Sequence, residues 1–268
     1  HYPLRRQRQM CIRDSSNPMK RIPSFGLTGD IIYEPMWVSD KFVPYTQTIM
    51  TVDPSGRGSD ETAVCVASLC NGFVYIHDLI GYPGGYEEPI LKKIVRLAIQ
   101  YNVKLIRVES NFGDAMYCQL LIPVLKKMSS NIGIEDFKVT GRKETRMLAA
   151  LEPAITQHRI VFDKRAISHE ETQKQITRLF DKKGALNKDD RVDALASAIS
   201  YWEDSLSISV DKIISKRVAK EGEDVIKSWI NDDRRMGLFS ERLQNAVTGQ
   251  KPRQRNCKWT EPRFWKNK

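Results

Sequence analysis

The fold is decided by one stretch of sequence, TIMTVDPSGRGSDETAVCVASLCNGFVYIHDLI, which covers residues Thr48–Ile80. Apolar residues run through Ile49–Val52, Thr62–Leu69 and Phe73–Ile80, and turn-forming residues separate the three runs. The Asn-Gly pair before the last run is typical of a tight hairpin. The stretch therefore predicts three antiparallel strands.

Beyond this stretch the hydrophobic period becomes helical. Helices are expected over Tyr86–Tyr101, Asp114–Met128 (with a kink or restart at Pro123), Lys143–His158, Glu170–Phe180 and Asp190–Leu206. Short strands are expected between them, at Lys104–Glu109, Phe137–Thr140 and Arg159–Asp163. Helical crossovers make successive strands parallel. The sequence thus predicts an α/β fold with a mixed sheet, three antiparallel strands followed by parallel ones, and helices on both faces.

The flanking regions differ from this domain in composition. Residues 1–45 are interpreted as a proline-containing lead-in with a short strand around Ile31–Tyr33, and residues 1–16 as a disordered or non-native arm. Residues 46–206 form the predicted domain. Residues 207–268 are predicted to be a basic tail, with one or two helices over Val210–Trp229 and a flexible end.

Composition narrows the classes of partner and site. The net charge of +10 suits a polyanion such as DNA, RNA or an anionic membrane. No apolar run is long enough to span a bilayer, and the basic N-terminus lacks the apolar segment of a secretory signal. The five cysteines and four histidines follow no zinc or redox spacing. We therefore expect reduced thiols in a cytosolic protein without a zinc site.

Four carboxylates occupy positions from which a metal site can be built. Asp53 and Glu109 each end a strand, and the two strands are expected to be parallel neighbours, so both acids emerge at one sheet edge. Asp190 and Asp193 share one face of the last helix at i,i+3 spacing. Asp193 lies beside the apolar stripe, where an unpaired carboxylate is costly. Oxygen ligands alone indicate Mg²⁺ or Mn²⁺.

Each acid also has a purely structural explanation. Asp189 or Asp190 can cap the last helix, Asp53 can start a turn before a proline, and Glu109 can be a surface acid. Their joint occurrence in this order, on this pattern of strands and helices, favours a metal site.

Three segments that carry these acids resemble the nuclease motifs of tailed-phage terminase large subunits, in the RNase H-like superfamily. They are Val52–Gly58, Arg107–Ser110 and Asp189–Ala196, and the similarity extends over residues 46–206. The segments are also similar to Holliday-junction resolvases. The resemblance implies an RNase H-like fold and an acidic triad that holds two metal ions.

By motif position Asp53 and Glu109 carry over as catalytic metal ligands, with Asp53 bridging the two ions. The third ligand is Asp193, with or without Asp190, and Asp189 remains an alternative. Asp60 resembles an accessory acid of some relatives. The implied reaction is two-metal phosphodiester hydrolysis by Mg²⁺ or Mn²⁺, without a side-chain nucleophile.

The resemblance implies an endonuclease that cuts double-stranded DNA concatemers during viral genome packaging, at the procapsid portal in the bacterial cytoplasm. The expected partners are DNA, a terminase small subunit and the portal protein, and no membrane. The chain lacks the G-x-x-x-x-G-K-[ST] motif of a packaging ATPase, so that part of the polypeptide is expected to be missing. A phosphate track is expected from basic residues near the motifs, namely Arg57, Arg142, Lys143, Arg146, Lys188 and Arg191.

Three alternatives stay open at this point. A junction resolvase would be dimeric and prefer branched DNA. A catalytically silent DNA-binding module on the same fold would need no metal. A soluble α/β domain whose acids are caps would bind no divalent ion tightly. The sequence does not decide between headful and site-specific cutting, nor the oligomeric state.

Overall fold

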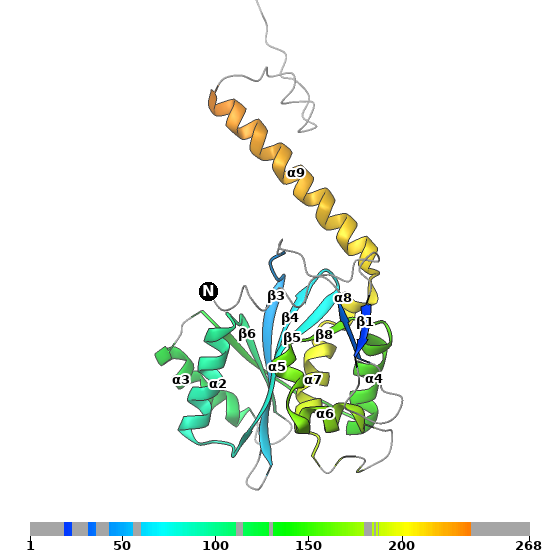
Figure 1. Ribbon diagram of the computed structural model, residues 1–268. Helices are drawn as coiled ribbons and strands as arrows, with labels where there is room; N and C mark the ends of the chain where they lie inside the picture. Colours follow the sequence, from blue (N-terminus) through cyan, green and yellow to red (C-terminus); the bar gives the residue numbers. More distant parts are fainter. Residues whose placement is uncertain are drawn as a thin grey trace, which may run out of the picture. The chain divides into compact units, whose positions relative to one another are not determined.

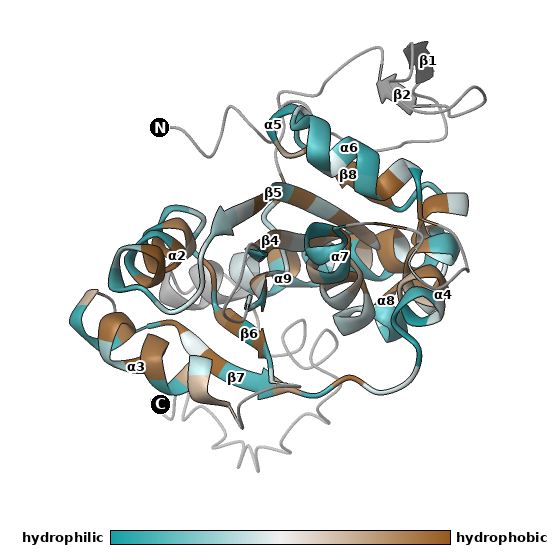
Figure 2. Cartoon of the chain, turned by 90° about the horizontal axis from the view of Figure 1, so that it is seen from below, coloured by the Kyte–Doolittle hydropathy of each residue, from teal (hydrophilic) through white to brown (hydrophobic). Residues whose placement is uncertain are grey.

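A six-stranded mixed sheet is the central element of the structure, a computed structural model that describes residues 19–22, 32–35, 43–55, 60–110, 115–128, 131–179, 184, 186 and 188–236. Its strands are β3 (Gln47–Asp53), β4 (Glu61–Cys70), β5 (Phe73–Pro83), β6 (Leu105–Glu109), β7 (Gly133–Phe137) and β8 (Ile160–Phe162). They lie in the order β7-β6-β3-β4-β5-β8 (Figures 1 and 2). β3, β4 and β5 are antiparallel, whereas β6, β7 and β8 run parallel to β3, β6 and β5. The predicted mixed sheet is confirmed.

Helices cover both faces of this sheet (Figures 1 and 2). One face carries α2 (Glu88–Gln100) and α3 (Met116–Met128). The other carries α4 (Lys143–Thr156), α5 (Lys164–Ile167), α6 (Glu170–Thr177), α7 (Asp190–Tyr201) and α8 (Glu203–Ser207). Apolar side chains of these helices pack against the sheet on each side, which gives the domain two hydrophobic cores.

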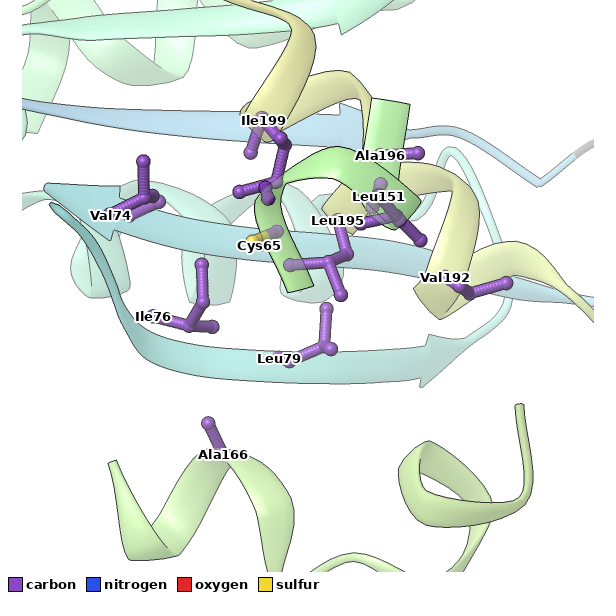
Figure 3. Close-up of a cluster of buried hydrophobic side chains, with 14 of the residues drawn as sticks. Cys65, Val74, Ile76, Leu79, Leu151, Ala166, Val192, Leu195, Ala196 and Ile199 are labelled. Atoms are coloured by element: carbon purple, nitrogen blue, oxygen red, sulfur yellow. The ribbon is translucent and has the colours of Figure 1, made fainter. Parts of the chain in front are cut away.

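The two cores follow from the alternation of side chains along each strand. On β3, Ile49 joins the core beneath α4 and α7, whereas Met50 and Val52 join the core beneath α2 and α3. A β-bulge in the β4–β5 ladder adds one residue to β5, so Ile76 and Leu79 both reach the α7 side (Figure 3). β3, β4 and most of β5 are thus buried on both faces, which explains their nearly continuous apolar runs, whereas in β6 buried and partly exposed residues alternate.

Helix α7 is the most deeply buried helix, with every residue from Arg191 to Ile199 buried. Alanine and serine are frequent in it, and such small side chains let a helix axis approach the sheet closely. The Thr51 hydroxyl of β3 donates a 2.7 Å hydrogen bond to the Ala194 carbonyl of α7. This buried bond fixes the first turn of α7 above the carboxyl end of β3.

Several predicted element bounds need correction. The strand predicted at Phe137–Thr140 is β7 at Gly133–Phe137, an edge strand whose exposed side chains obscure the period. The predicted restart at Pro123 does not occur, since α3 continues through this exposed proline. The predicted helix Asp190–Leu206 divides at the buried Trp202 into α7 and α8.

Shorter elements were missed or misplaced at their ends. Helix α5 was not predicted, and α6 ends at Thr177, while Phe180 lies outside the described residues. The strand expected around Ile31–Tyr33 corresponds to β2 (Ile32–Pro35), which pairs with the unpredicted β1 (Met19–Ile22). Cys65, Cys70 and Cys118 are buried, and the other two cysteines lie outside the described residues.

The chain divides into two compact units, residues 1–213 and 214–268, and the predicted domain boundaries remain a prediction. Helix α9 (Val210–Met236) supplies the described part of the second unit and is one helix. Its exposed apolar side chains include Val218, Val225 and Trp229. Within the described residues, no helix is both long and apolar enough to cross a bilayer.

The Thr51–Ala194 bond predicts a measurable contribution to stability. Replacing Thr51 with Val keeps the shape of the side chain but removes the buried hydroxyl, and we expect the free energy of unfolding to fall by about 1 kcal/mol in urea denaturation. Thr51→Ser keeps the hydroxyl and serves as the control for the hydrogen bond. A Thr51→Val protein as stable as the wild type would show that the bond contributes nothing.

Candidate active site

Two acidic residues meet at the carboxyl end of neighbouring strands. β3 and β6 pair in parallel, with Val52 opposite Val108, and the next residues along the two strands are Asp53 and Glu109. Thr51 faces α7, so Asp53, two residues further on, faces the same side. The predicted parallel pairing of the two strands is confirmed, and it brings both acids to one sheet edge under α7.

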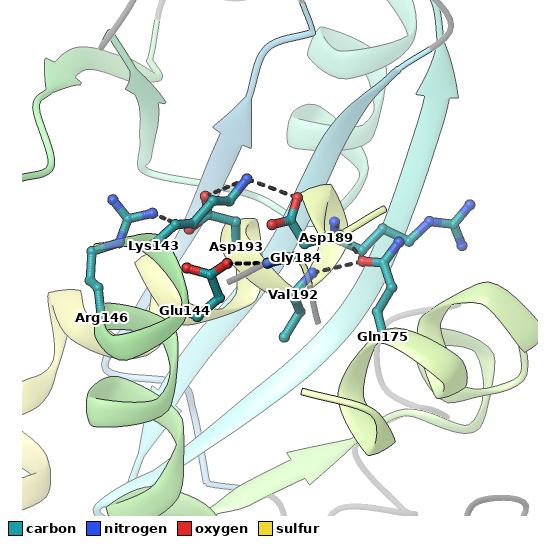
Figure 4. A network of polar contacts seen from close by, with 9 residues as sticks. Lys143, Glu144, Arg146, Gln175, Gly184, Asp189, Val192 and Asp193 are labelled. Atoms are coloured by element: carbon teal, nitrogen blue, oxygen red, sulfur yellow. Dashed lines mark hydrogen bonds and ion pairs between the residues drawn. The ribbon is translucent and has the colours of Figure 1, made fainter. Parts of the chain in front are cut away.

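Asp193 enters the same region from the first turn of α7. Its side chain is only 2% exposed, and both carboxylate oxygens are engaged. The Lys143 ammonium lies 3.1 Å from Oδ2, and the Arg146 guanidinium donates a hydrogen bond to Oδ1 (Figure 4). Lys143 also donates a 2.9 Å hydrogen bond to Asp189, just before α7. Two cations from α4 thus bind the acidic start of α7.

The pKa values show that the acids form one electrostatic cluster. Burial raises the pKa of Asp53 well above its ordinary value, and the neighbouring Asp193 carboxylate raises it further. Glu109 and Asp190 act in the same direction, while the Lys143 ammonium opposes them. Asp53 therefore experiences three other carboxylates from β6 and α7.

The pKa shifts of Glu109 and Lys143 have their causes in the same cluster. Burial raises the pKa of Glu109, Asp193 adds to this rise, and Arg146 and Lys143 oppose it. Burial acts to lower the pKa of Lys143, but Asp193, Asp53 and Asp189 together outweigh it and raise the pKa. The ammonium is accordingly held in its charged form by the acids around it.

Asp190 lies at the border of the cluster, next to the loop that follows Asp53. Burial raises its pKa, Lys143 opposes the rise, and Asp189 and Asp60 add to it. Asp60 itself is exposed. The structure therefore brings Asp60 within electrostatic reach of Asp190, but it does not place Asp60 among the causes acting on Asp53.

The start of α7 is capped by a residue that sequence reasoning missed. The buried Gln175 of α6 accepts hydrogen bonds from the backbone N–H groups of Arg191 (3.0 Å) and Val192 (3.2 Å; Figure 4). In the described part of the chain, the Asp189 side chain makes no capping hydrogen bond. The alternative that Asp189 serves as the helix cap is therefore wrong, and its carboxylate binds Lys143 instead. No local sequence signal identifies Gln175, because the contact spans sixteen residues.

One basic residue of the predicted phosphate track has a different position from the one expected. Arg191 is 8% exposed, and its guanidinium pairs with Glu61 of β4 at 2.9 Å and donates to the Thr172 hydroxyl of α6. This side chain joins α6, α7 and β4, and the prediction of a DNA contact for Arg191 is withdrawn. Glu61 was not singled out in the sequence.

The other basic residues divide into two groups. Arg142 and Lys188 are exposed near the cluster, and Arg142 lies 3.6 Å from Glu144. Lys143 and Arg146 are partly buried and face the acids. Arg57 lies outside the described residues. Arg142 and Lys188 are thus the exposed part of the predicted track that the structure describes.

The donor set fits a hard divalent cation. It consists of carboxylate oxygens that raise one another's pKa, and a cation with two charges relieves such repulsion. Among the described residues, no three Asp, Glu, His or Cys side chains are gathered closely enough to hold one ion as they stand. Asp193 is instead bound by Lys143 and Arg146. The chemistry of the donors fits, while Asp193 is turned to protein cations.

The sequence is similar to those of known terminase proteins. Residues 52–160 match the family described as "Terminase Bacteriophage T7, Ribonuclease H-like domain". The match contains Asp53 and Glu109 and ends before α7. The chain is also 32% identical over 212 residues to the terminase large subunit of Enterobacteria phage T3, an alignment that covers 74% of this chain and 36% of the relative. The chain thus spans about a third of the length of that relative.

Solved structures with a similar arrangement include two terminase domains. The Mn-soaked human cytomegalovirus terminase nuclease domain is 16% identical, with a TM-score of 0.46, over 61% of this chain and 86% of that one. The nuclease domain of the large terminase subunit gp2 of bacterial virus Sf6 is 15% identical, with a TM-score of 0.44, over 59% of this chain and 90% of that one.

The capping role of Gln175 leads to a stability prediction. Gln175→Leu leaves two buried N–H groups without their acceptor, and we expect it to lower the free energy of unfolding by about 1–3 kcal/mol in urea denaturation. Gln175→Glu keeps an acceptor at a helix N-terminus and should lose less. Equal losses in the two variants would mean that packing, and not capping, accounts for the effect.

The raised pKa of Asp53 leads to a second prediction. A carboxyl whose pKa is raised on folding destabilises the folded state when ionised, so stability without metal is expected to fall as the pH rises above the ordinary Asp pKa of about 4. At pH 7 in EDTA, Asp53→Asn should raise Tm by a few degrees, since about 1 kcal/mol corresponds to ~2–4 °C in a domain of this size. Asp204→Asn, at an exposed position of α8, is the control and should leave Tm unchanged. A lower Tm for Asp53→Asn would contradict the prediction.

Proposed function

Because this chain belongs to the family of terminase large subunits, whose Ribonuclease H-like domain it contains, we propose that it is a metal-dependent endonuclease that cuts double-stranded DNA during viral genome packaging. The observation that carries this proposal is the convergence of Asp53, Glu109 and Asp193 at one sheet edge, where they act on one another electrostatically. Carboxylates that are removed from water and raise one another's pKa cluster at functional sites.

The acids have distinct positions with respect to the proposed ions. Asp53 belongs to a central strand held by β4 on one side and β6 on the other, so it is the most rigid ligand and is proposed to bridge two ions. Glu109 and Asp193, the latter with or without Asp190, would complete one ion each. Bound Mg²⁺ or Mn²⁺ would supply a nucleophilic water and stabilise the leaving 3′ oxygen. In this proposal the protein supplies the ligands, and no side chain acts as the nucleophile.

The exposed cations near the cluster support DNA as the substrate. Arg142 and Lys188 lie at the surface beside it, and the net charge of the chain is +10. Contacts that such side chains make with phosphates position DNA without reading its bases. We therefore propose weak sequence preference and strong dependence of DNA binding on salt.

A role in genome packaging would belong to a longer polypeptide, because the alignment covers only 36% of the phage T3 relative. We propose that it works with a terminase small subunit, a portal protein and an ATPase domain of the same polypeptide, in the cytoplasm of a bacterial host. The junction-resolvase alternative is not favoured, because the sequence matches are to terminases. No described feature favours the silent DNA-binding module.

Cleavage of supercoiled plasmid tests this function directly. We expect nicking and linearisation with Mn²⁺ or Mg²⁺, none with EDTA, and a loss of at least about 100-fold in rate for Asp53→Asn, Glu109→Gln and Asp193→Asn, because each removes a ligand charge. Asp204→Asn is the matched control, since this acid is exposed on α8 away from the cluster. DNA binding without cleavage in every metal, unchanged by Asp53→Asn, would refute the nuclease and support the silent binding module.

A further inference from the structure

Two basic side chains of α4 are inserted into the acidic cluster rather than exposed at its rim. Lys143 and Arg146 are three residues apart and so lie on the same face of the helix. Their side chains are 38% and 21% exposed, whereas the Asp193 carboxylate that they share is 2% exposed. A buried carboxylate of this kind requires a cation close to it.

The two cations occupy the carboxylate completely. Lys143 binds Oδ2 of Asp193 and Arg146 binds Oδ1, so neither oxygen lacks a charged partner (Figure 4). The same cations oppose the rise in the pKa of Glu109, and Lys143 opposes the rise in that of Asp53. They therefore balance the charge of the same acids that the proposed divalent ions would bind.

A divalent ion and these side chains compete for one set of oxygens. An ion that coordinates Asp193 takes one or both oxygens from Lys143 and Arg146, and its two positive charges repel the displaced cations. Lys143 is the more easily displaced of the two, because its single charge sits at the end of a flexible and partly exposed chain.

We propose that Lys143 and Arg146 are exchangeable counter-cations, which stabilise the metal-free acidic cluster and compete with the divalent ion for Asp193. This inference rests on the proposed function only in that the cluster binds a divalent ion. It assigns the two residues a role different from direct phosphate contact. They set the affinity for the metal and keep the site folded before the metal arrives.

Calorimetric titration with Mn²⁺ tests the competition without any measurement of cleavage. Lys143→Met keeps the apolar stem and removes the charge, and we expect it to bind Mn²⁺ at least about tenfold more tightly than the wild type, since a repelling charge a few ångströms away is removed. Arg146→Met should show the same direction. The matched control is Lys174→Met, because Lys174 is 43% exposed and ion-paired with Glu170 on the surface of α6; its Mn²⁺ affinity should equal that of the wild type.

Thermal unfolding in EDTA provides the second readout. Lys143→Met should lower Tm by removing the partner of a buried charge, and Lys143→Met combined with Asp193→Asn should recover most of the loss. Added Mn²⁺ should raise the Tm of Lys143→Met more than that of the wild type. Where Lys143→Met does not fold in EDTA, Lys143→Gln replaces it in both experiments.

The outcomes separate this inference from the proposed function. Unchanged or weaker Mn²⁺ binding by Lys143→Met, together with wild-type binding that disappears in Asp53→Asn, overturns the counter-cation role and leaves the nuclease proposal intact. Absence of Mn²⁺ binding in the wild type and in every variant overturns both. If Mn²⁺ binds to Lys143→Met or Arg146→Met but not to the wild type, the two cations prevent metal binding altogether, which supports the proposed competition.

Discussion

Repulsion between like charges is the constraint on which the arrangement of this domain depends. Asp53, Glu109 and Asp193 lie at the edge of a sheet that is packed on both faces; Asp193 is buried and the other two are half-buried, so water screens their charges less than it would at an open surface. The repulsion between these charges therefore lowers the stability of the folded domain. Proteins retain such a cost at sites where charge is used, because a ligand or partner offsets it there.

The scaffold prevents the acids from moving apart. Asp53 and Glu109 are fixed by the parallel pairing of β3 with β6, a ladder that cannot shift without turning every buried side chain outward. Asp193 is fixed because the Thr51 hydroxyl ties α7 to β3 and Gln175 caps the first turn of the helix. Since Gln175 satisfies the backbone of α7 from outside, the aspartates at its start are not needed as caps. Their carboxylates are left for charged partners.

Sequence reasoning reached the parts of this arrangement that depend on local pattern. The strands of residues 48–80, the parallel neighbour ending in Glu109 and the acidic start of α7 all follow from periodicity, turn residues and crossover rules. It missed features that depend on contacts between distant residues. These are the capping of α7 by Gln175 and the buried ion pair between Arg191 and Glu61. It also misplaced β7. An edge strand buries few side chains, so its sequence does not show the alternation of apolar and polar residues that identifies a strand.

The start of α4 connects the acidic cluster to the segment that leads into α7. Lys143 binds Asp189 as well as Asp193, and the Glu144 carboxylate accepts a 2.9 Å hydrogen bond from the backbone N–H of Gly184. In the proposed exchange, a divalent ion that displaced Lys143 from Asp193 would also weaken its contact with Asp189, because one ammonium contacts both acids. The first turn of α4 thus contacts the acidic cluster, Asp189 and Gly184 at the same time. These shared contacts explain why the acids and the cations of α4 have to be considered as one unit.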